Sequence, residues 1–180
     1  MVAQNRQSLL GANYAVLAYS PPYDPNPSCF GALVWKRLMG RHGLGTVAST
    51  RQASVRAYAH CHPTLGVANG TVTLALVNIN PNKTVDVQLV AAGSASADHG
   101  RSGALRLNSS DRMHYMLTTD SPHSRTVSLN GSPQPLQLDA DGQLPTALAW
   151  HAGGLPLRIA PLSYGFVDVL LEAGAARARA

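Results

Sequence analysis

A single helical pattern near the start of the chain is followed only by short strand-like segments, and this order restricts the folds that are available. Residues 28–40 (SCFGALVWKRLMG) repeat apolar side chains at helical spacing. The residues of this stripe are Phe30, Leu33, Val34 and Leu38. Asn26 is placed as an N-cap, Pro27 suits the first helical position, and Gly40 suits a helix end. We therefore predict one helix, which begins at Pro27 and ends near Gly40.

The remaining sequence consists of short apolar segments separated by Gly, Pro, Asn and Asp, a pattern that is typical of antiparallel β structure. Aromatic residues make up 6% and charged residues 13% of the chain, which does not favour a helical bundle. The predicted strands are residues 45–50, 54–61, 71–80, 84–90, 112–119, 126–129, 136–138 and 157–171. Residues 71–80 are apolar on both faces, which predicts a central strand, and residues 91–110 are predicted to form a flexible loop. The fold class that follows is mainly β, an antiparallel β-sandwich.

The first part of the chain does not fit a sandwich. Residues 2–10 are strand-like, but one strand and one helix cannot bury both their faces alone. We therefore expect residues 1–42 to be the edge of a larger α/β unit and residues 43–171 to form the sandwich. Residues 172–180, rich in Ala and Arg, are expected to be a disordered tail.

The chain is basic, with a formal net charge of +5 and a sequence pI near 9.6. Nucleic-acid binding is typical of clustered Lys and Arg interleaved with aromatic residues. Here the basic residues are scattered, and the only dense group is Arg177 and Arg179. We expect no nucleic-acid partner, and an acidic glycan suits the same charge. The sequence has no apolar run of the roughly 18 residues that a membrane-spanning helix needs, and its N-terminus does not have a signal-peptide pattern.

The acidic residues do not form a catalytic pair. Glycosidic cleavage usually needs two carboxylates that flank the bond, and the only glutamate is Glu172. Asp139 and Asp141 are close in sequence, but they stand in an Asp-Gly turn pattern. We therefore expect no catalytic residue in this chain.

Three further patterns are weak. On a strand, His60 and His62 point to one side and Cys61 to the other, so these residues do not converge on a metal. Residues 162–165 (LSYG) lack the first glycine of a nucleophile elbow, and no glycine-rich phosphate loop is present. We expect neither a metal nor another cofactor.

The cysteines and sequons bear on cellular location. Cys29 and Cys61 do not make a disulfide framework, and the sequence does not show whether they approach each other. Four Asn-X-Ser/Thr sequons in turn-like contexts are candidate N-glycosylation sites, at Asn69, Asn82, Asn108 and Asn130. The sequons favour a secretory route.

Gln7 and Tyr14 are the remaining candidates for a binding role. A Gln at the end of a strand, followed by a Tyr in the next loop, is placed as the binding residues of a barrel enzyme are placed. The alternative is a buried Gln and a Tyr that only packs. The residue pattern alone leaves both readings open.

Several sequence strings, in the same order along the chain, resemble heparanase-like enzymes of glycoside hydrolase family 79, especially the plant-type members. They are residues 6–14 (RQSLLGANY), 25–27 (PNP), 32–40 (ALVWKRLMG), 56–61 (RAYAHC), 114–118 (HYMLT), 128–131 (SLNG) and 159–166 (IAPLSYGF). The resemblance runs from about Asn5 to Leu170.

The resemblance implies a (β/α)8 barrel followed by a β-sandwich, and a retaining mechanism with two glutamates that cleaves β-linked glucuronic acid. Residues 1–42 then correspond to the last barrel strand and helix, and both glutamates lie upstream of this chain. Gln7 and Tyr14 match positions that hold the uronic acid. The family's cysteine at the position of Cys61 pairs with one near the C-terminus, which has no counterpart here.

The function expected from the resemblance is that of a C-terminal fragment of a β-glucuronidase, inactive alone. Its partners would be the upstream barrel and an acidic glycan or proteoglycan. The alternative is a non-catalytic carbohydrate-binding or structural β-sandwich module. The resemblance and the sequons suggest an extracellular, lysosomal or vacuolar location and allow peripheral membrane association.

Overall fold

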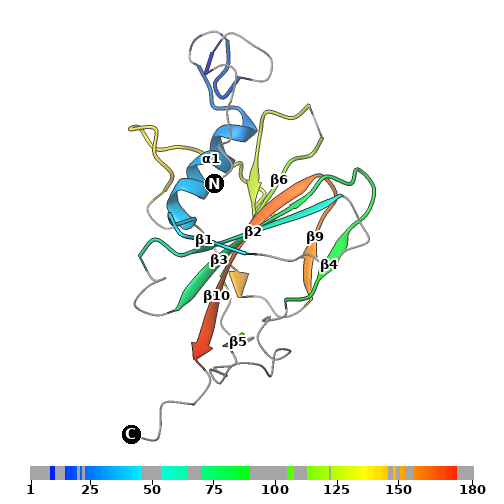
Figure 1. Ribbon diagram of the computed structural model, residues 1–180. Helices are drawn as coiled ribbons and strands as arrows, with labels where there is room; N and C mark the ends of the chain where they lie inside the picture. The colour runs from blue at the N-terminus through cyan, green and yellow to red at the C-terminus, as the bar shows by residue number, and fades with distance from the viewer. Residues whose placement is uncertain are drawn as a thin grey trace, which may run out of the picture.

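The computed structural model contains a helix packed on an antiparallel sheet (Figure 1). It describes residues 9–10, 15–19, 21, 23–45, 54–64, 70–89, 105–107, 113–121, 123–145, 148, 151–152 and 156–173. The helix is α1 (Pro27–Leu38). The strands are β1 (Gly43–Leu44), β2 (Val55–Cys61), β3 (Thr71–Asn78), β4 (Val85–Val87), β5 (Leu105–Leu107), β6 (Met113–Thr118), β7 (Ser128–Leu129), β8 (His151–Ala152), β9 (Leu157–Ile159) and β10 (Ser163–Ala173).

Among the described residues, the main sheet has eight strands, and its central path runs β1-β2-β3-β10-β6-β7. Strand β5 pairs with the end of β10 and β8 pairs with β6, while β4 and β9 form a separate two-stranded sheet. All of these pairings are antiparallel. The predicted fold class, mainly β and antiparallel, is confirmed.

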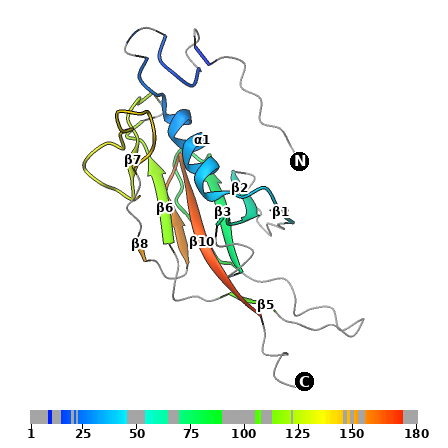
Figure 2. The ribbon, with the colours of Figure 1, turned by 90° about the vertical axis from the view of Figure 1, so that its left-hand side faces the viewer.

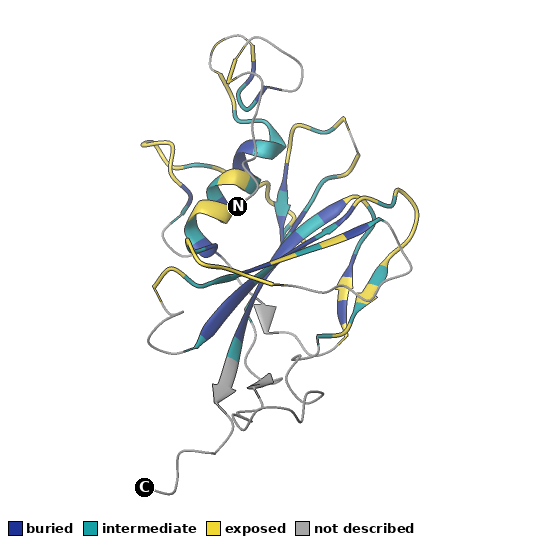
Figure 3. Ribbon diagram, viewed as in Figure 1, coloured by how far each residue is buried: buried dark blue, intermediate teal, exposed yellow. Residues whose placement is uncertain are grey.

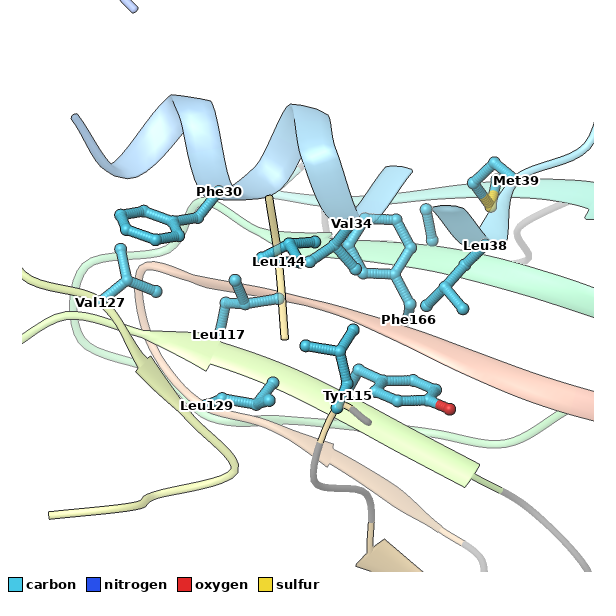
Figure 4. Close-up of a cluster of buried hydrophobic side chains, with 12 residues drawn as sticks. Phe30, Val34, Leu38, Met39, Tyr115, Leu117, Val127, Leu129, Leu144 and Phe166 are labelled. Carbon is cyan, nitrogen blue, oxygen red and sulfur yellow. The ribbon is translucent and has the colours of Figure 1, made fainter. Parts of the chain in front are cut away.

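The helix lies along one face of the main sheet, as Figure 2 shows, and buries its apolar stripe there. Figure 4 labels most of the resulting cluster: Phe30, Val34, Leu38, Met39, Tyr115, Leu117, Val127, Leu129, Leu144 and Phe166. Val34 and Leu117 are completely buried. Because α1 lies before residue 42 and the strands lie after it, the hydrophobic core crosses the predicted domain boundary.

The opposite face of the main sheet is covered by the β4–β9 pair. Leu157 and Ile159 of β9 pack against Leu76 of β3 and against Val167 and Val169 of β10. Successive residues of β10 therefore serve different cores, as the two-residue period of a strand requires. Figure 3 shows the resulting band of buried residues along the central strands. The predicted central position of residues 71–80 is confirmed, since β3 lies between β2 and β10.

The predicted single strand 157–171 is wrong. The chain turns between β9 and β10, where Leu162 has a φ of 48° and the Ser163 hydroxyl donates to the Ala160 carbonyl oxygen at 2.6 Å. Strand β9 then belongs to the small sheet and β10 to the main sheet. A positive φ at a leucine reverses the chain within a stretch whose apolarity looks continuous.

Other boundaries also differ. Strand β5 lies inside the predicted loop 91–110, and β10 continues through Ala173, into the predicted tail. The predicted strand 136–138 is absent, and next to it Pro135 forms only an isolated bridge with Ser128, because proline has no N–H for a ladder. Most of the predicted strands 2–10 and 45–50 lies outside the described residues.

Local turn signals were more reliable. Asn130 and Gly131 have φ values of 52° and 69°, as a two-residue hairpin turn requires. The Asn80 side-chain oxygen accepts the Asn82 and Lys83 amides at 2.9 Å, which makes the predicted turn after β3. Within the described part of the chain, α1 is neither long nor apolar enough to cross a membrane.

Candidate functional site

The two residues predicted to hold a substrate, Gln7 and Tyr14, lie outside the described residues. The chain that follows Tyr14 in sequence is described for the most part and leads directly into α1. We call residues 15–26 the entry segment. It lies beyond the N-terminal end of α1 (Figure 1), and its contacts determine how the start of the helix is held.

The entry segment is folded back on itself by backbone hydrogen bonds. The Ala18 amide donates to the Asp24 carbonyl at 2.8 Å, and the Asn26 amide donates to the Val16 carbonyl at 2.9 Å. Tyr23, close to the tip, has a φ of 61°, which is rare for a bulky residue. Tyr19 is 77% exposed. The segment therefore has a defined turn that projects an aromatic side chain into solvent.

Asn26 occupies the predicted N-cap position with extended backbone angles, and Pro27 follows at the first helical position. The Asn26 side chain, however, makes no capping hydrogen bond to the helix. The Asn26 Nδ2 instead donates to the Ala15 carbonyl oxygen at 2.8 Å. A side-chain cap stabilises a helix by about 1 kcal/mol, so this Asn forgoes a usual contribution in order to hold the entry segment.

Tyr164 in β10 fastens the same helix end from the sheet. Its hydroxyl donates to the Pro27 carbonyl oxygen at 3.0 Å, and burial raises the pKa of Tyr164 to about 12, so the hydroxyl remains a donor. A Cβ on Gly31 would lie 2.7 Å from this hydroxyl oxygen. Gly31 therefore leaves the space in which Tyr164 crosses the helix.

A second polar group is buried on the same face of the sheet. Asp168 of β10 is 3% exposed, and its Oδ1 accepts the Thr73 hydroxyl at 2.6 Å. The His62 Nε2 lies 3.9 Å from the Asp168 Oδ2. Burial raises the pKa of Asp168, while the Thr73 hydrogen bond and the His62 charge act in the opposite direction. This cluster links β3 and β10 with His62, the residue that follows β2.

The His60-Cys61-His62 string is divided as the strand pattern predicts. The His60 Nδ1 donates to the Gly40 carbonyl oxygen at 2.6 Å, and its ring lies 5.5 Å from the Trp35 ring. His62 is directed to Asp168, whereas Cys61 pairs in register with Val72. Among the described residues, no three His, Cys, Asp or Glu side chains are placed to share a metal ion.

The remaining candidates for chemistry have structural roles. The Asp139 Oδ1 accepts the Asp141 and Gln143 amides at 3.0 and 2.8 Å, so the prediction of a turn at this site is confirmed. Ser163 is 2% exposed, and its hydroxyl is held in the turn before β10. Both cysteines have free thiols, and burial raises the pKa of Cys29.

The two sequon asparagines that the structure describes differ in accessibility. Asn82 is exposed in the turn after β3. The Asn130 side chain is bound to β6, because its Nδ2 donates to the His114 carbonyl at 3.0 Å and its Oδ1 accepts the Met116 amide at 2.7 Å. Asn69 and Asn108 lie outside the described residues. Of the two described asparagines, Asn82 is therefore the better placed to carry a glycan.

Sequence reasoning missed the two contacts that hold the entry segment, Asn26 with Ala15 and Tyr164 with Pro27. The second contact joins residues 137 positions apart, so no local pattern encodes it. A glycine in the middle of a helix, here Gly31, was the available signal, because such a residue often marks a close approach.

In the described part of the chain, the fold and these contacts define an antiparallel β-sandwich domain with helix α1 in its core, and the full sequence contains a single glutamate. No protein-family model matches the chain. Curated proteins do match it. Heparanase-like protein 3 of Arabidopsis thaliana is 32% identical over 183 residues, which cover 91% of this chain and 32% of that protein.

Two further relatives agree. Baicalin-beta-D-glucuronidase of Scutellaria baicalensis is 32% identical and covers 91% of this chain, with 28% of its own length matched. Heparanase-like protein 1 of Arabidopsis thaliana is 30% identical and covers 90% of this chain, with 32% of its own length matched. The chain is thus a relative of the heparanase-like proteins of glycoside hydrolase family 79 and corresponds to their C-terminal part. It spans about a third of the length of these relatives.

Proposed function

We propose that this chain is the C-terminal β-domain of a heparanase-like β-glucuronidase, and that it has no hydrolase activity alone. The observation that carries the proposal is the similarity along 91% of this chain to about a third of the relative's length. The single glutamate supports it, because a retaining glycosidase needs an acid and a nucleophile. Two catalytic glutamates then come from a barrel upstream of residue 1.

The substrate class that we propose is a glycan or glycoside with β-linked glucuronic acid. One relative carries a glucuronidase activity in its name, and a net charge of +5 favours an anionic substrate. Gln7 and Tyr14 are proposed to contact the uronic acid. Changing Tyr14 to Phe in the longer protein should raise KM or lower kcat on a glucuronide, and unchanged kinetics would refute this role.

The proposed location is extracellular, lysosomal or vacuolar. The exposed Asn82 supports it, since a sequon in an accessible turn suits a glycoprotein. Mass spectrometry of the secreted protein, before and after removal of N-glycans, would test Asn82. A bare Asn82 in the secreted protein would refute Asn82 as a glycan site, and recovery of the protein only from the cytosol would refute the proposed location.

A direct experiment compares two proteins on a chromogenic β-glucuronide. The first is the 180-residue chain, and the second is the product of the same gene extended upstream. We expect hydrolysis only by the second, with two upstream glutamates required. Hydrolysis by the 180-residue chain alone would overturn the proposal.

A second candidate function is non-catalytic glycan binding. It is favoured by two exposed rings, Trp35 and Tyr58, which are 36% and 47% exposed and have centroids 6.0 Å apart. Aromatic surfaces of this kind suit a sugar ring, and the basic chain suits an acidic one. This candidate predicts salt-dependent binding to an acidic oligosaccharide that is lost in Trp35→Ala, with no hydrolysis even by the extended protein.

A further inference from the structure

The entry segment and the start of α1 are held at adjacent backbone positions by two side chains. Asn26 donates its side-chain amide to the Ala15 carbonyl at 2.8 Å, which closes the segment onto the helix. Tyr164 donates to the Pro27 carbonyl at 3.0 Å, which fixes the helix end to β10. The two contacts form a continuous path from the centre of the main sheet to Ala15, the residue that follows Tyr14 in sequence.

At both contacts the chain departs from the arrangement that local helix preferences favour. An Asn at this position usually accepts a hydrogen bond from the first turn of the helix, but the Asn26 side chain makes no such bond. Ala is preferred to Gly inside a helix, but at Gly31 its Cβ would collide with the Tyr164 hydroxyl. Such departures from local preference concentrate where a geometry serves a function.

The anchor at the sheet end is rigid. β10 pairs with β3 over eight residues and with β6 over five, and Tyr164 takes part in both ladders. Its ring also lies 6.5 Å from the Phe166 ring, within the core beneath α1. A hydrogen bond from this position therefore transmits the geometry of the sheet to the helix start.

We propose that Asn26 and Tyr164 are positioning residues for uronic-acid recognition: they hold the entry segment at a fixed position relative to the main sheet. The inference rests on the proposed function, which assigns substrate contacts to Gln7 and Tyr14, just before this segment. It gives the β-domain a specific part in the reaction. Small misplacements of binding groups lower catalytic efficiency by large factors, so loss of either contact should weaken substrate use without unfolding the domain.

The variants are chosen to separate positioning from stability. Asn26→Asp keeps the size of the side chain and a good N-cap but removes the Nδ2 donor. Tyr164→Phe keeps the ring and removes only the hydroxyl. Tyr115→Phe is the matched control, because Tyr115 is also a core tyrosine under α1, but its hydroxyl contacts the Met113 sulfur at 3.7 Å, away from the entry segment.

The first measurement is hydrogen exchange on the 180-residue chain. We expect the Ala18 and Asn26 amides to exchange about threefold to tenfold faster in Asn26→Asp and Tyr164→Phe, and at the wild-type rate in Tyr115→Phe. Unchanged hydrogen exchange in both variants would refute the proposal that Asn26 and Tyr164 hold the entry segment. This result does not depend on any enzymatic activity.

The second measurement is steady-state kinetics on a β-glucuronide with the upstream-extended protein. We expect kcat/KM to fall about tenfold or more in both variants, mainly through KM, with the control unchanged. Wild-type kinetics in variants whose entry segment has loosened would overturn the positioning role while the proposed function stands. An inactive wild-type extended protein would instead refute the proposed function and, with it, the recognition role assigned here.

Discussion

The two faces of the main sheet are covered in different ways. The face beneath α1 contains the ring contacts of Trp35, Tyr164 and Phe166, and the buried Asp168. The other face is covered by the short β4–β9 pair, and the buried residues of its core are all Leu, Ile or Val. An aliphatic core needs only shape and volume, whereas rings, hydroxyls and a carboxylate need specific partners. On the other face, the buried Asn78 donates its Nδ2 to the Ile159 and Ala160 carbonyl oxygens at 3.1 and 2.9 Å. The aromatic rings and the buried carboxylate, each with specific partners, lie on the α1 face.

The largest expected effect is on the α1 face. Phe166→Ala removes a side chain that is 2% exposed and that contacts the rings of both Trp35 and Tyr164. We expect the free energy of unfolding to fall by about 3–5 kcal/mol, measured by urea denaturation. A loss below 1 kcal/mol would mean that α1 is not held by this core.

A smaller loss should follow from filling the space under Tyr164. Gly31→Ala improves intrinsic helix propensity by up to about 1 kcal/mol. Its new Cβ nevertheless collides with the Tyr164 hydroxyl, so we expect a net destabilisation of about 1–2 kcal/mol. The Tyr164 Cε2 and Cζ would also lie 2.9 and 3.0 Å from this Cβ, so the same change should be better tolerated only where the ring is removed, as in a Tyr164→Leu background. Equal effects of Gly31→Ala in the wild-type and Tyr164→Leu backgrounds would refute the close approach.

The buried carboxylate should make stability depend on pH. The pKa of Asp168 is raised by burial, so the folded state binds its proton more tightly than the unfolded state. Its contribution is most favourable below the ordinary aspartate pKa near 3.8 and is lost as pH rises through the elevated value. The groups that face Asp168 are Thr73, His62 and Tyr115.

Asp168→Asn should remove this dependence, because an amide does not titrate and its oxygen still accepts the Thr73 hydroxyl. For each unit by which the pKa of Asp168 is raised, the difference in free energy of unfolding between the wild type and Asp168→Asn should change by about 1.4 kcal/mol over the pH range in which Asp168 titrates. Urea melts of both proteins between acidic and neutral pH measure it. Parallel curves would show that Asp168 is not perturbed.

The aliphatic face should be more tolerant. Ile159→Val removes one methylene from a completely buried side chain, and we expect a loss of about 0.5–1.5 kcal/mol with no effect on the entry segment. Faster hydrogen exchange of the Ala18 amide in this variant would show that packing on the β4–β9 face affects the entry segment, and that the two faces of the main sheet do not act independently.

The smallest effect is expected at the edge of that face. Arg158 and Asp86 form an ion pair at 3.3 Å, but their side chains are 80% and 51% exposed. Asp86→Ala should change the free energy of unfolding by less than about 0.5 kcal/mol and less still in high salt. A loss of 2 kcal/mol would indicate that the β4–β9 pair depends on this contact.

Local signals accounted for much of the fold. The apolar stripe and end signals located α1, and alternation located β2 and β3. Elements that depend on distant partners were missed. Strand β5 exists because the end of β10 pairs with it, and the continuous apolarity of residues 157–171 concealed a turn between two sheets.

The candidate site was less accessible to sequence reasoning. Gln7 and Tyr14 were singled out by their place at the end of a predicted strand, the resemblance assigned them to the uronic acid, and both stay predictions. Asn26 was correctly placed at the helix start, but the direction of its side chain depends on where the Ala15 carbonyl lies in space. The local sequence pattern therefore located Asn26 but did not predict its hydrogen bond to Ala15.

The sequence by itself determined the class of fold, the helix and the central strands, because the periodicity that marks them is set by neighbouring residues. The shortage of catalytic carboxylates follows directly from the composition. Only the tertiary structure decided that α1 shares its core with the sheet, and that Tyr164 and Asn26 hold the entry segment. The shared core and the Tyr164–Pro27 contact join groups far apart in sequence, so their formation depends on how the whole chain closes around them.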